Sequence, residues 1–207
     1  MKIVLFDVDG TILDSMGAWE NMGRIYLKSK GIDTSQNINN ILYPLTSMQA
    51  ASFLKNEYHL EDSIQEIIEN FHKCLHDFYL YDVKLKEGII DVLEEFKKHH
   101  YQLFIATAST KELVEKSFER LNINHYFNSI FTCDALGISK NDPYFYKKIA
   151  FKLQVKPKDI IVFEDSYNAA LSAKKAGMKV IGVYDQYTRG HLQDIVHTYI
   201  NKWEELL

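Results

Sequence analysis

Residues 1–15 read MKIVLFDVDGTILDS, and this stretch contains the first indication of both fold and chemistry. An apolar run at residues 2–6 leads directly into Asp7 and Asp9, with Gly10 immediately behind them. A continuous apolar run predicts a strand that is buried on both faces. In an open parallel sheet, ligands bind beyond the carboxyl ends of the strands. The two carboxylates therefore stand where chemistry is expected.

Beyond residue 85, short apolar runs alternate with amphipathic helical stretches. The runs cover residues 103–107, 129–133, 160–165 and 179–184. Strands that alternate with helices predict right-handed βαβ units. We therefore expect an α/β fold whose core is a doubly wound, Rossmann-like parallel sheet, with the first strand in the same sheet.

Residues 15–83 show apolar positions at helical spacing instead. We interpret them as a helical cap domain inserted after the first strand, with residues 1–14 and 84–207 forming the α/β core domain. An insertion that leaves the sheet beside the carboxylates is placed to act as a lid over the carboxyl edge.

Composition excludes several classes of protein. The 207 residues are 46% hydrophobic and carry a net charge of −4. Without a basic stripe or an Arg-rich block, we expect no nucleic-acid partner. Since no leader pattern or spanning stretch occurs, we expect no membrane partner and a cytoplasmic location. Cys74 and Cys133 lack metal spacing and are interpreted as free thiols. We expect the protein to be a monomer.

Three explanations compete for Asp7 and Asp9. They could belong to a turn or a helix cap, because Asp and Gly are common there. A calcium loop fails on spacing, since it needs glycine at its sixth position and Gly10 is fourth from Asp7. A catalytic carboxylate pair that holds a metal is the third, and it predicts further ligands at other strand ends.

Other strand ends carry such groups. The run that starts at residue 160 ends in Glu164 and Asp165, which turn chemistry alone does not readily explain. Carboxylates from two strand ends would form an oxygen site suited to Mg²⁺. After residues 103–107, Ser109 and Glu112 form a capping-box pattern, and the helix start there predicts an anion pocket.

Together these segments resemble the haloacid dehalogenase-like superfamily, in its helical-cap subgroup close to beta-phosphoglucomutase and phosphoglycolate phosphatase. The resemblance covers essentially the whole chain. It rests on four motifs in matching order and spacing: Asp7-Val8-Asp9-Gly10-Thr11, then Thr107, then Lys140 with Pro143, and finally Glu164-Asp165-Ser166.

The resemblance implies a role for each motif. Asp7 would be the nucleophile that forms an aspartyl-phosphate, and Asp9 the general acid and base. Phosphoryl oxygens would be bound by Thr107, Ala108 and Lys140, and Lys140 would also keep Asp7 ionised. The metal would be Mg²⁺. Its ligands would be the carboxylates of Asp7 and Asp165, the backbone carbonyl of Asp9, and Glu164 as an outer or occasional ligand.

The resemblance favours a phosphatase acting on a small phosphomonoester such as a sugar phosphate. A phosphomutase of the beta-phosphoglucomutase type is the alternative, although Arg24 is the only arginine of the helical segment. A non-catalytic binding protein on the same fold is a further alternative. Trp19 is interpreted as lining the lid, or else as packing in the core of that segment; Tyr43 and Thr46 are the other candidate substrate contacts.

Overall fold

The structure is a computed structural model, and it describes residues 2–34, 38–42, 45, 47–187 and 190–207. Two compact units divide the chain. The sheet unit comprises Met1–Ser15 and Val83–Leu207, and the helical unit comprises Met16–Asp82. In the described part of the chain, no helix is both long and apolar enough to cross a bilayer.

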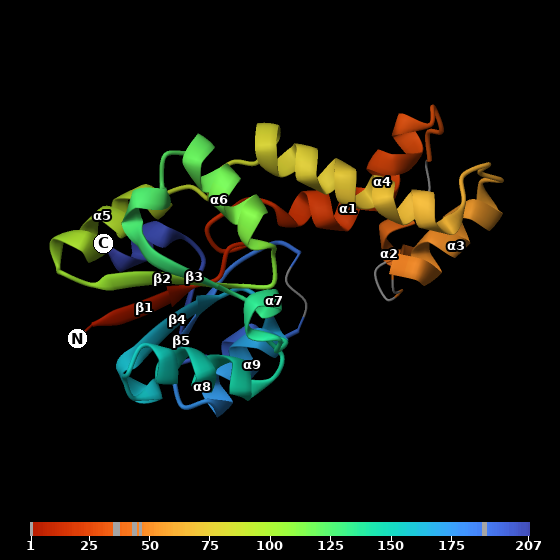
Figure 1. Cartoon of the computed structure of the whole chain (residues 1–207). Coiled ribbons are helices and arrows are strands. Elements are labelled where there is room, and N and C mark those ends of the chain that lie inside the picture. The colour runs from red at the N-terminus through yellow and green to blue at the C-terminus, as the bar shows by residue number, and fades with distance from the viewer. Residues whose placement is uncertain (1, 35–37, 43–44, 46, 188–189) are drawn as a thin grey trace. The chain divides into compact units, whose positions relative to one another are not determined.

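The sheet unit is built on six parallel strands in the order β3-β2-β1-β4-β5-β6 (Figure 1). Their bounds are β1 Ile3–Phe6, β2 Gln102–Thr107, β3 Phe127–Thr132, β4 Ile160–Glu164, β5 Lys179–Val183 and β6 Thr198–Ile200. The predicted α/β fold with a parallel sheet is confirmed. The order reverses at β1, so the crevice that binds ligands in such sheets is expected at the end of that strand.

Two details of the sheet differ from expectation. The short strand β6 was not predicted, because three residues carry too little pattern to be recognised. The third strand ends at Thr132, and Cys133 begins a helix instead of closing the strand. The Thr132 side chain accepts a hydrogen bond from the amide of Ala135, which caps that helix at its first turn.

Helices cover both faces of the sheet. Figure 1 shows α8 and α9 on one face and α5 and α6 on the other. Successive apolar side chains along each strand point to opposite faces and pack against these helices. Ile3 and Leu5, for example, belong to the core cluster that includes residues of α8 and α9. The bounds are α5 Ile89–Lys98, α6 Lys111–Arg120, α7 Cys133–Leu136, α8 Pro143–Lys152 and α9 Tyr167–Lys175.

The helical unit has a separate apolar core. Its helices are α1 Met16–Ser29, α2 Ile38–Leu42, α3 Ser47–Glu57 and α4 Ile64–Asp77, which continues into a π-helical turn at Phe78–Asp82. A capping box between Ser63 and Glu66 sets the start of α4. Within the core, Tyr26 and Phe71 meet edge to face at 5.4 Å. The assignment of the two units as catalytic core and cap stays a prediction.

Candidate active site

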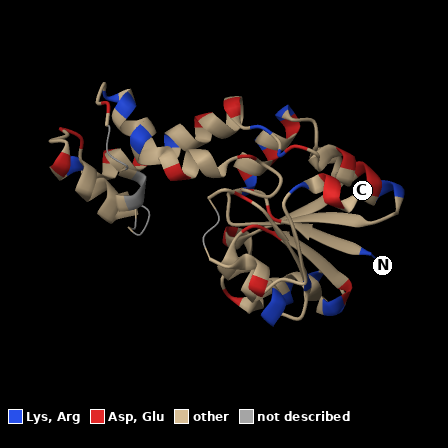
Figure 2. Ribbon diagram, turned by 180° about the vertical axis from the view of Figure 1, so that it is seen from behind, with Lys and Arg blue, Asp and Glu red and all other residues tan. Residues whose placement is uncertain are grey.

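The ends of two adjacent strands bring three carboxylates together. Phe6 of β1 pairs with Phe163 of β4, and the amide of Asp7 donates to the carbonyl of Phe163 at 3.0 Å. Glu164 and Asp165 directly follow Phe163, so all three acids reach the same edge. One oxygen from each acid lies within 4.8 Å of the others, and all three residues are buried. Figure 2 shows red, acidic segments where strands of the sheet end.

A tight turn holds Asp7 in place. Gly10 has φ 78°, a left-handed conformation that side chains other than glycine rarely adopt. Its amide donates to the carbonyl of Leu13 at 2.9 Å, while the amides of Ile12 and Leu13 both donate to the carbonyl of Val8. We call residues 7–13 the nucleophile loop, after the role that is predicted for Asp7. The glycine of the motif is therefore required by the backbone of this loop.

Lys140 reaches the acids from the entry to α8. Asp142 caps that helix by accepting from the amide of Tyr144 at 2.8 Å, and proline occupies its first turn. The Lys140 ammonium donates to the Asp7 carboxylate and lies 2.8 Å from Glu164 Oε2. Only 7% of this lysine is exposed, so the interpretation as an ordinary surface charge does not apply.

Burial sets the ionisation of the cluster. It raises the pKa of Asp7 to about 7, with a further contribution from the charge of Glu164 and opposition from Lys140. Burial, Asp7 and Glu164 also raise the pKa of Asp165 well above its usual range. For Lys140 itself, burial lowers the pKa, but the two carboxylates outweigh it and hold the pKa well above its ordinary value. Lys140 lowers the pKa of Asp7, but burial and Glu164 outweigh this effect, and the expectation that Lys140 keeps Asp7 ionised stays a prediction.

The cluster fits a divalent metal ion. Three carboxylates with one ammonium leave a formal charge of −2, which such an ion would neutralise. Burial and mutual repulsion raise the pKa values of Asp7 and Asp165, and a bound cation would favour their ionised forms. Hard oxygen ligands of this kind suit Mg²⁺. Glu164 belongs to the cluster as fully as Asp165; a ligand role for the Asp9 backbone carbonyl stays a prediction.

The carboxylate of Asp9 is held by two serine hydroxyls. The Ser15 hydroxyl donates to its Oδ1 and the Ser109 hydroxyl to its Oδ2, each at 2.6 Å. The capping box predicted for Ser109 and Glu112 is wrong. Thr110 is the cap of α6, and its side chain accepts from the amide of Leu113. Because Thr110 caps the helix, the Ser109 hydroxyl can turn toward Asp9.

Thr107 and Ala108 lie at the end of β2, next to β1 in the sheet. Thr107 is fully buried, and its hydroxyl oxygen accepts a hydrogen bond from the amide of Ser109 at 3.0 Å. Ala108 is exposed. The turn thus lies at the same edge of the sheet as the three acids, and the role of Thr107 and Ala108 in phosphate binding stays a prediction.

Tyr146 is a member of the site that the sequence analysis missed. It is fully buried in α8, and its hydroxyl donates to Glu164 Oε2 at 3.3 Å. A second contact to Glu164 comes from the amide of Ser166, at 3.1 Å from Oε1. Tyr146 shares an apolar helix face with Ile149 and Ala150, and a buried tyrosine hydroxyl needs a polar partner. That pattern could have identified it.

The candidate substrate contacts are only partly described. Trp19 is 39% exposed, and its indole nitrogen donates to the hydroxyl of Tyr79 at 2.9 Å within the helical unit. Tyr43 and Thr46 lie outside the described residues. All three assignments stay predictions.

Comparison with known sequences agrees with this geometry. The family model for haloacid dehalogenase-like hydrolases matches residues 4–183. The curated protein YhcW of Bacillus subtilis, a candidate phosphatase, is 39% identical over 62 residues. That match covers 30% of this chain and 28% of YhcW. It is therefore a local similarity.

Solved structures share the fold over almost the whole chain. A candidate beta-phosphoglucomutase from Thermotoga maritima superposes with a TM-score of 0.87 at 23% identity, covering 100% of this chain and 97% of that one. YfnB from Bacillus subtilis, a candidate hydrolase with bound magnesium, superposes with a TM-score of 0.81 at 22% identity, covering 99% and 96%. At these identities the likeness concerns the fold.

Proposed function

Because the chain belongs to the haloacid dehalogenase-like hydrolase family, we propose that it is a Mg²⁺-dependent phosphatase for a small phosphomonoester, such as a sugar phosphate or a similar metabolite. The chain is thus a hydrolase, and its phosphatase and phosphomutase relatives support phosphoryl chemistry. The observation that carries the proposal is the buried contact of Asp7 with Lys140, beside Glu164 and Asp165.

In the first step, an Asp7 carboxylate oxygen attacks the phosphorus atom, and the bond from phosphorus to the leaving oxygen breaks. Asp9 gives its proton to the leaving oxygen. In the second step, Asp9 removes a proton from water, which attacks the same phosphorus and releases Asp7 as a carboxylate. Lys140, Thr107 and the Ala108 amide bind the phosphoryl oxygens, over which charge spreads in the transition state.

Asp7, Glu164 and Asp165 would hold Mg²⁺, together with the Asp9 carbonyl. When bound, the metal supplies positive charge that offsets the repulsion between the nucleophile and the anionic phosphate. The magnesium in YfnB supports this choice of metal. The expectations that the protein is a cytoplasmic monomer stay predictions.

Hydrolysis is favoured over mutase transfer by the helical unit. A mutase needs cations to bind a second phosphate. Lys55 is engaged in main-chain contacts, since its three donors meet the carbonyls of residues 60–62 at 3.1, 3.3 and 2.5 Å. That leaves exposed Arg24 on α1 as the one arginine of this unit that could bind a second phosphate. We therefore propose that water, and not a second sugar hydroxyl, accepts the phosphoryl group.

Two measurements test the proposal. Hydrolysis of p-nitrophenyl phosphate is expected with Mg²⁺ and lost with EDTA, followed by a phosphate-release screen of small phosphometabolites to identify the substrate. Absence of Mg²⁺-dependent hydrolysis across that panel would favour a binding protein. Incubation with a hexose 1-phosphate and a catalytic amount of hexose bisphosphate should release phosphate; isomer formation that outpaces release would identify a mutase.

A further inference from the structure

The segment after β5 reaches back to the nucleophile loop through one side chain. Trp203, which is 2% exposed, donates its indole N–H to the backbone carbonyl of Thr11 at 3.2 Å. The two residues are 192 positions apart. Residue 183 is the last one that the family model matches, so Trp203 lies outside the matched range.

The indole ring also packs against both strands that carry the acids. Its centroid lies 5.9 Å from the ring of Phe6 and 5.0 Å from that of Phe163. The two phenylalanine rings are themselves stacked, with their centroids 4.9 Å apart. In the sequence, Phe6 immediately precedes Asp7, and Phe163 immediately precedes Glu164. One buried side chain therefore contacts both strand ends and the loop.

Local contacts hold Trp203 in this position. Glu205 Oε1 accepts from the amides of Asn201 and Lys202 at 3.0 and 3.1 Å, which fixes the turn before the tryptophan. The segment also lies beside Gly88, where a Cβ would lie 2.7 Å from a carboxylate oxygen of Glu204.

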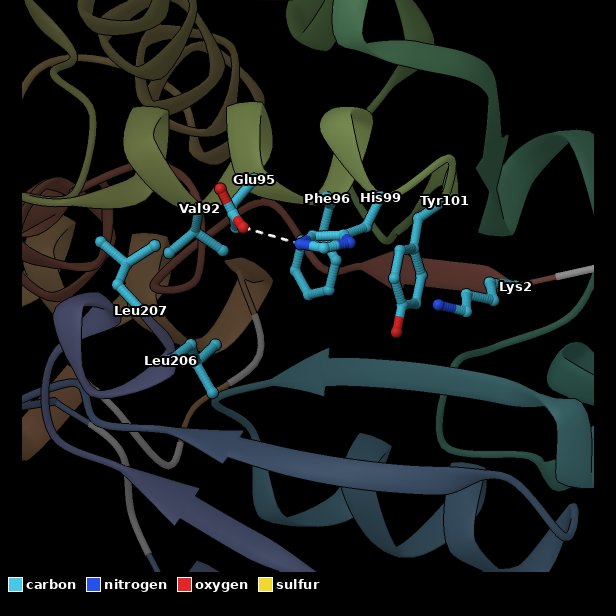
Figure 3. A pocket seen from close by; sticks show the side chains of 8 residues that line it. All are labelled: Lys2, Val92, Glu95, Phe96, His99, Tyr101, Leu206 and Leu207. Atoms are coloured by element: carbon cyan, nitrogen blue, oxygen red, sulfur yellow. Dashed lines mark hydrogen bonds and ion pairs between the residues drawn. The ribbon is translucent and has the colours of Figure 1, made fainter.

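The segment also lies beside α5. Leu206 and Leu207 line a hollow of about 330 Å³ together with Val92 and Phe96 (Figure 3). Phe96 in turn meets the rings of Phe6 and Phe163 at 6.0 and 5.9 Å. Support for the two strands therefore comes from α5 and from Trp203 together.

We propose that Trp203 is a positioning residue, which fixes the nucleophile loop through the Thr11 carbonyl and thereby sets the attack geometry of Asp7. The inference rests on the proposed phosphatase function for its kinetic consequence. Loss of the N–H donor leaves a buried carbonyl without its partner and allows the loop to shift, and displacements of this kind reduce rates steeply.

The test compares Trp203→Phe with Leu192→Ala. Trp203→Phe keeps an aromatic ring and removes the donor. Leu192 is buried in the core cluster of the opposite sheet face, so Leu192→Ala destabilises the same C-terminal region without touching the loop. For Trp203→Phe we expect kcat to fall about tenfold with KM within about twofold. Folded Leu192→Ala should keep both values.

Hydrogen exchange supplies a readout that needs no substrate. The amides of residues 8–13 should exchange faster in Trp203→Phe than in wild type. In Leu192→Ala their exchange rates should equal those of wild type. Glu205→Ala, at an exposed position, should give the same pattern more weakly and replaces Trp203→Phe if that variant does not fold. Unchanged exchange in the loop, or an equal increase in Leu192→Ala, would overturn the inference. Wild-type protein without phosphatase activity would overturn the proposed function, while exchange would still decide the role of Trp203.

Discussion

The carboxyl edge of the sheet and the helical unit Met16–Asp82 use their polar residues in different ways. At the sheet edge, buried polar groups from distant segments bond to one another, as Lys140 does with Asp7 and Glu164. In the helical unit, the contacts of Lys55 and of Ser63 with Glu66 stay within a few residues and fix helix ends. Longer-range pairs such as Trp19 with Tyr79 join segments of the same unit. We therefore expect polar groups of the first region to serve chemistry and those of the second to serve its own fold.

The comparison predicts that substitutions at the sheet edge change rates, whereas those in the helical unit change stability. Asp7→Asn should have the largest effect, because an amide cannot attack phosphorus. We expect a loss of at least about a thousandfold in kcat, the scale seen when a nucleophile is removed. Steady-state kinetics with p-nitrophenyl phosphate measures it, and circular dichroism checks that the fold is retained. Substantial residual turnover would remove Asp7 from this role.

Asp9→Asn should come next. The amide cannot transfer protons, and general acid–base catalysis contributes about 10² to 10⁴ in rate. The loss should be greater for an alkyl phosphate than for p-nitrophenyl phosphate, whose leaving group needs no proton. Comparing kcat for both esters measures this. Equal activity of variant and wild type on the alkyl ester would contradict the assignment.

Tyr146→Phe should act through the metal cluster. Removing the hydroxyl takes one donor from Glu164, and the loss of such an outer contact costs about 10- to 100-fold in metal affinity or activity. We expect the Mg²⁺ concentration for half-maximal activity to rise. Tyr144→Phe is the matched control, since Tyr144 lies two residues earlier and is 61% exposed. A similar rise in both variants would contradict a specific role.

The pH dependence of Mg²⁺ binding should follow Asp7. Its pKa of about 7 exceeds the value near 3.8 expected in the unfolded chain. Native protein without metal therefore retains a proton that the unfolded chain has released, and its stability falls as pH rises from about 4 to 7. Because Mg²⁺ requires the carboxylates and the pKa of Asp165 is raised as well, the Mg²⁺ affinity should rise at least about tenfold from pH 6 to pH 8. Calorimetric titration measures this, and a pH-independent affinity would contradict the raised pKa.

Lys55→Ala should have the smallest effect on chemistry. It removes the donor to three carbonyls after α3 and should lower the stability of the helical unit by about 1–2 kcal/mol. Thermal unfolding measures the loss, while kcat at low temperature should match wild type. A drop in kcat comparable to that of Tyr146→Phe would break the contrast between the two regions.

The part of the candidate site that could be predicted from the sequence lies directly after recognisable strands. Asp7, Asp9 and Asp165 follow buried strands directly, so strand direction alone places them at one edge. Lys140 needed the family resemblance, because its partners lie on other strands.

Contacts between distant segments explain what was missed. Nothing near Trp203 in the sequence indicates its partner, since it reaches Thr11 across 192 positions. Ser15 is a different case: it lies six residues from Asp9, and the shape of the loop brings the two together. The capping error at Ser109 has a local cause: adjacent hydroxyl residues at 109 and 110 compete for one cap, and backbone geometry decides between them.

The chain has two tryptophans, and each unit contains one of them. Trp19 is 39% exposed and Trp203 is 2% exposed, so their fluorescence emission should differ in wavelength and in quenching by acrylamide. Trp203→Phe would leave one optical reporter in the helical unit, and Trp19→Phe would leave one in the sheet unit. Unfolding of the sheet unit and of the helical unit can thus be followed separately in the intact chain without added dyes, which makes the protein suited to measuring how strongly its two units are coupled.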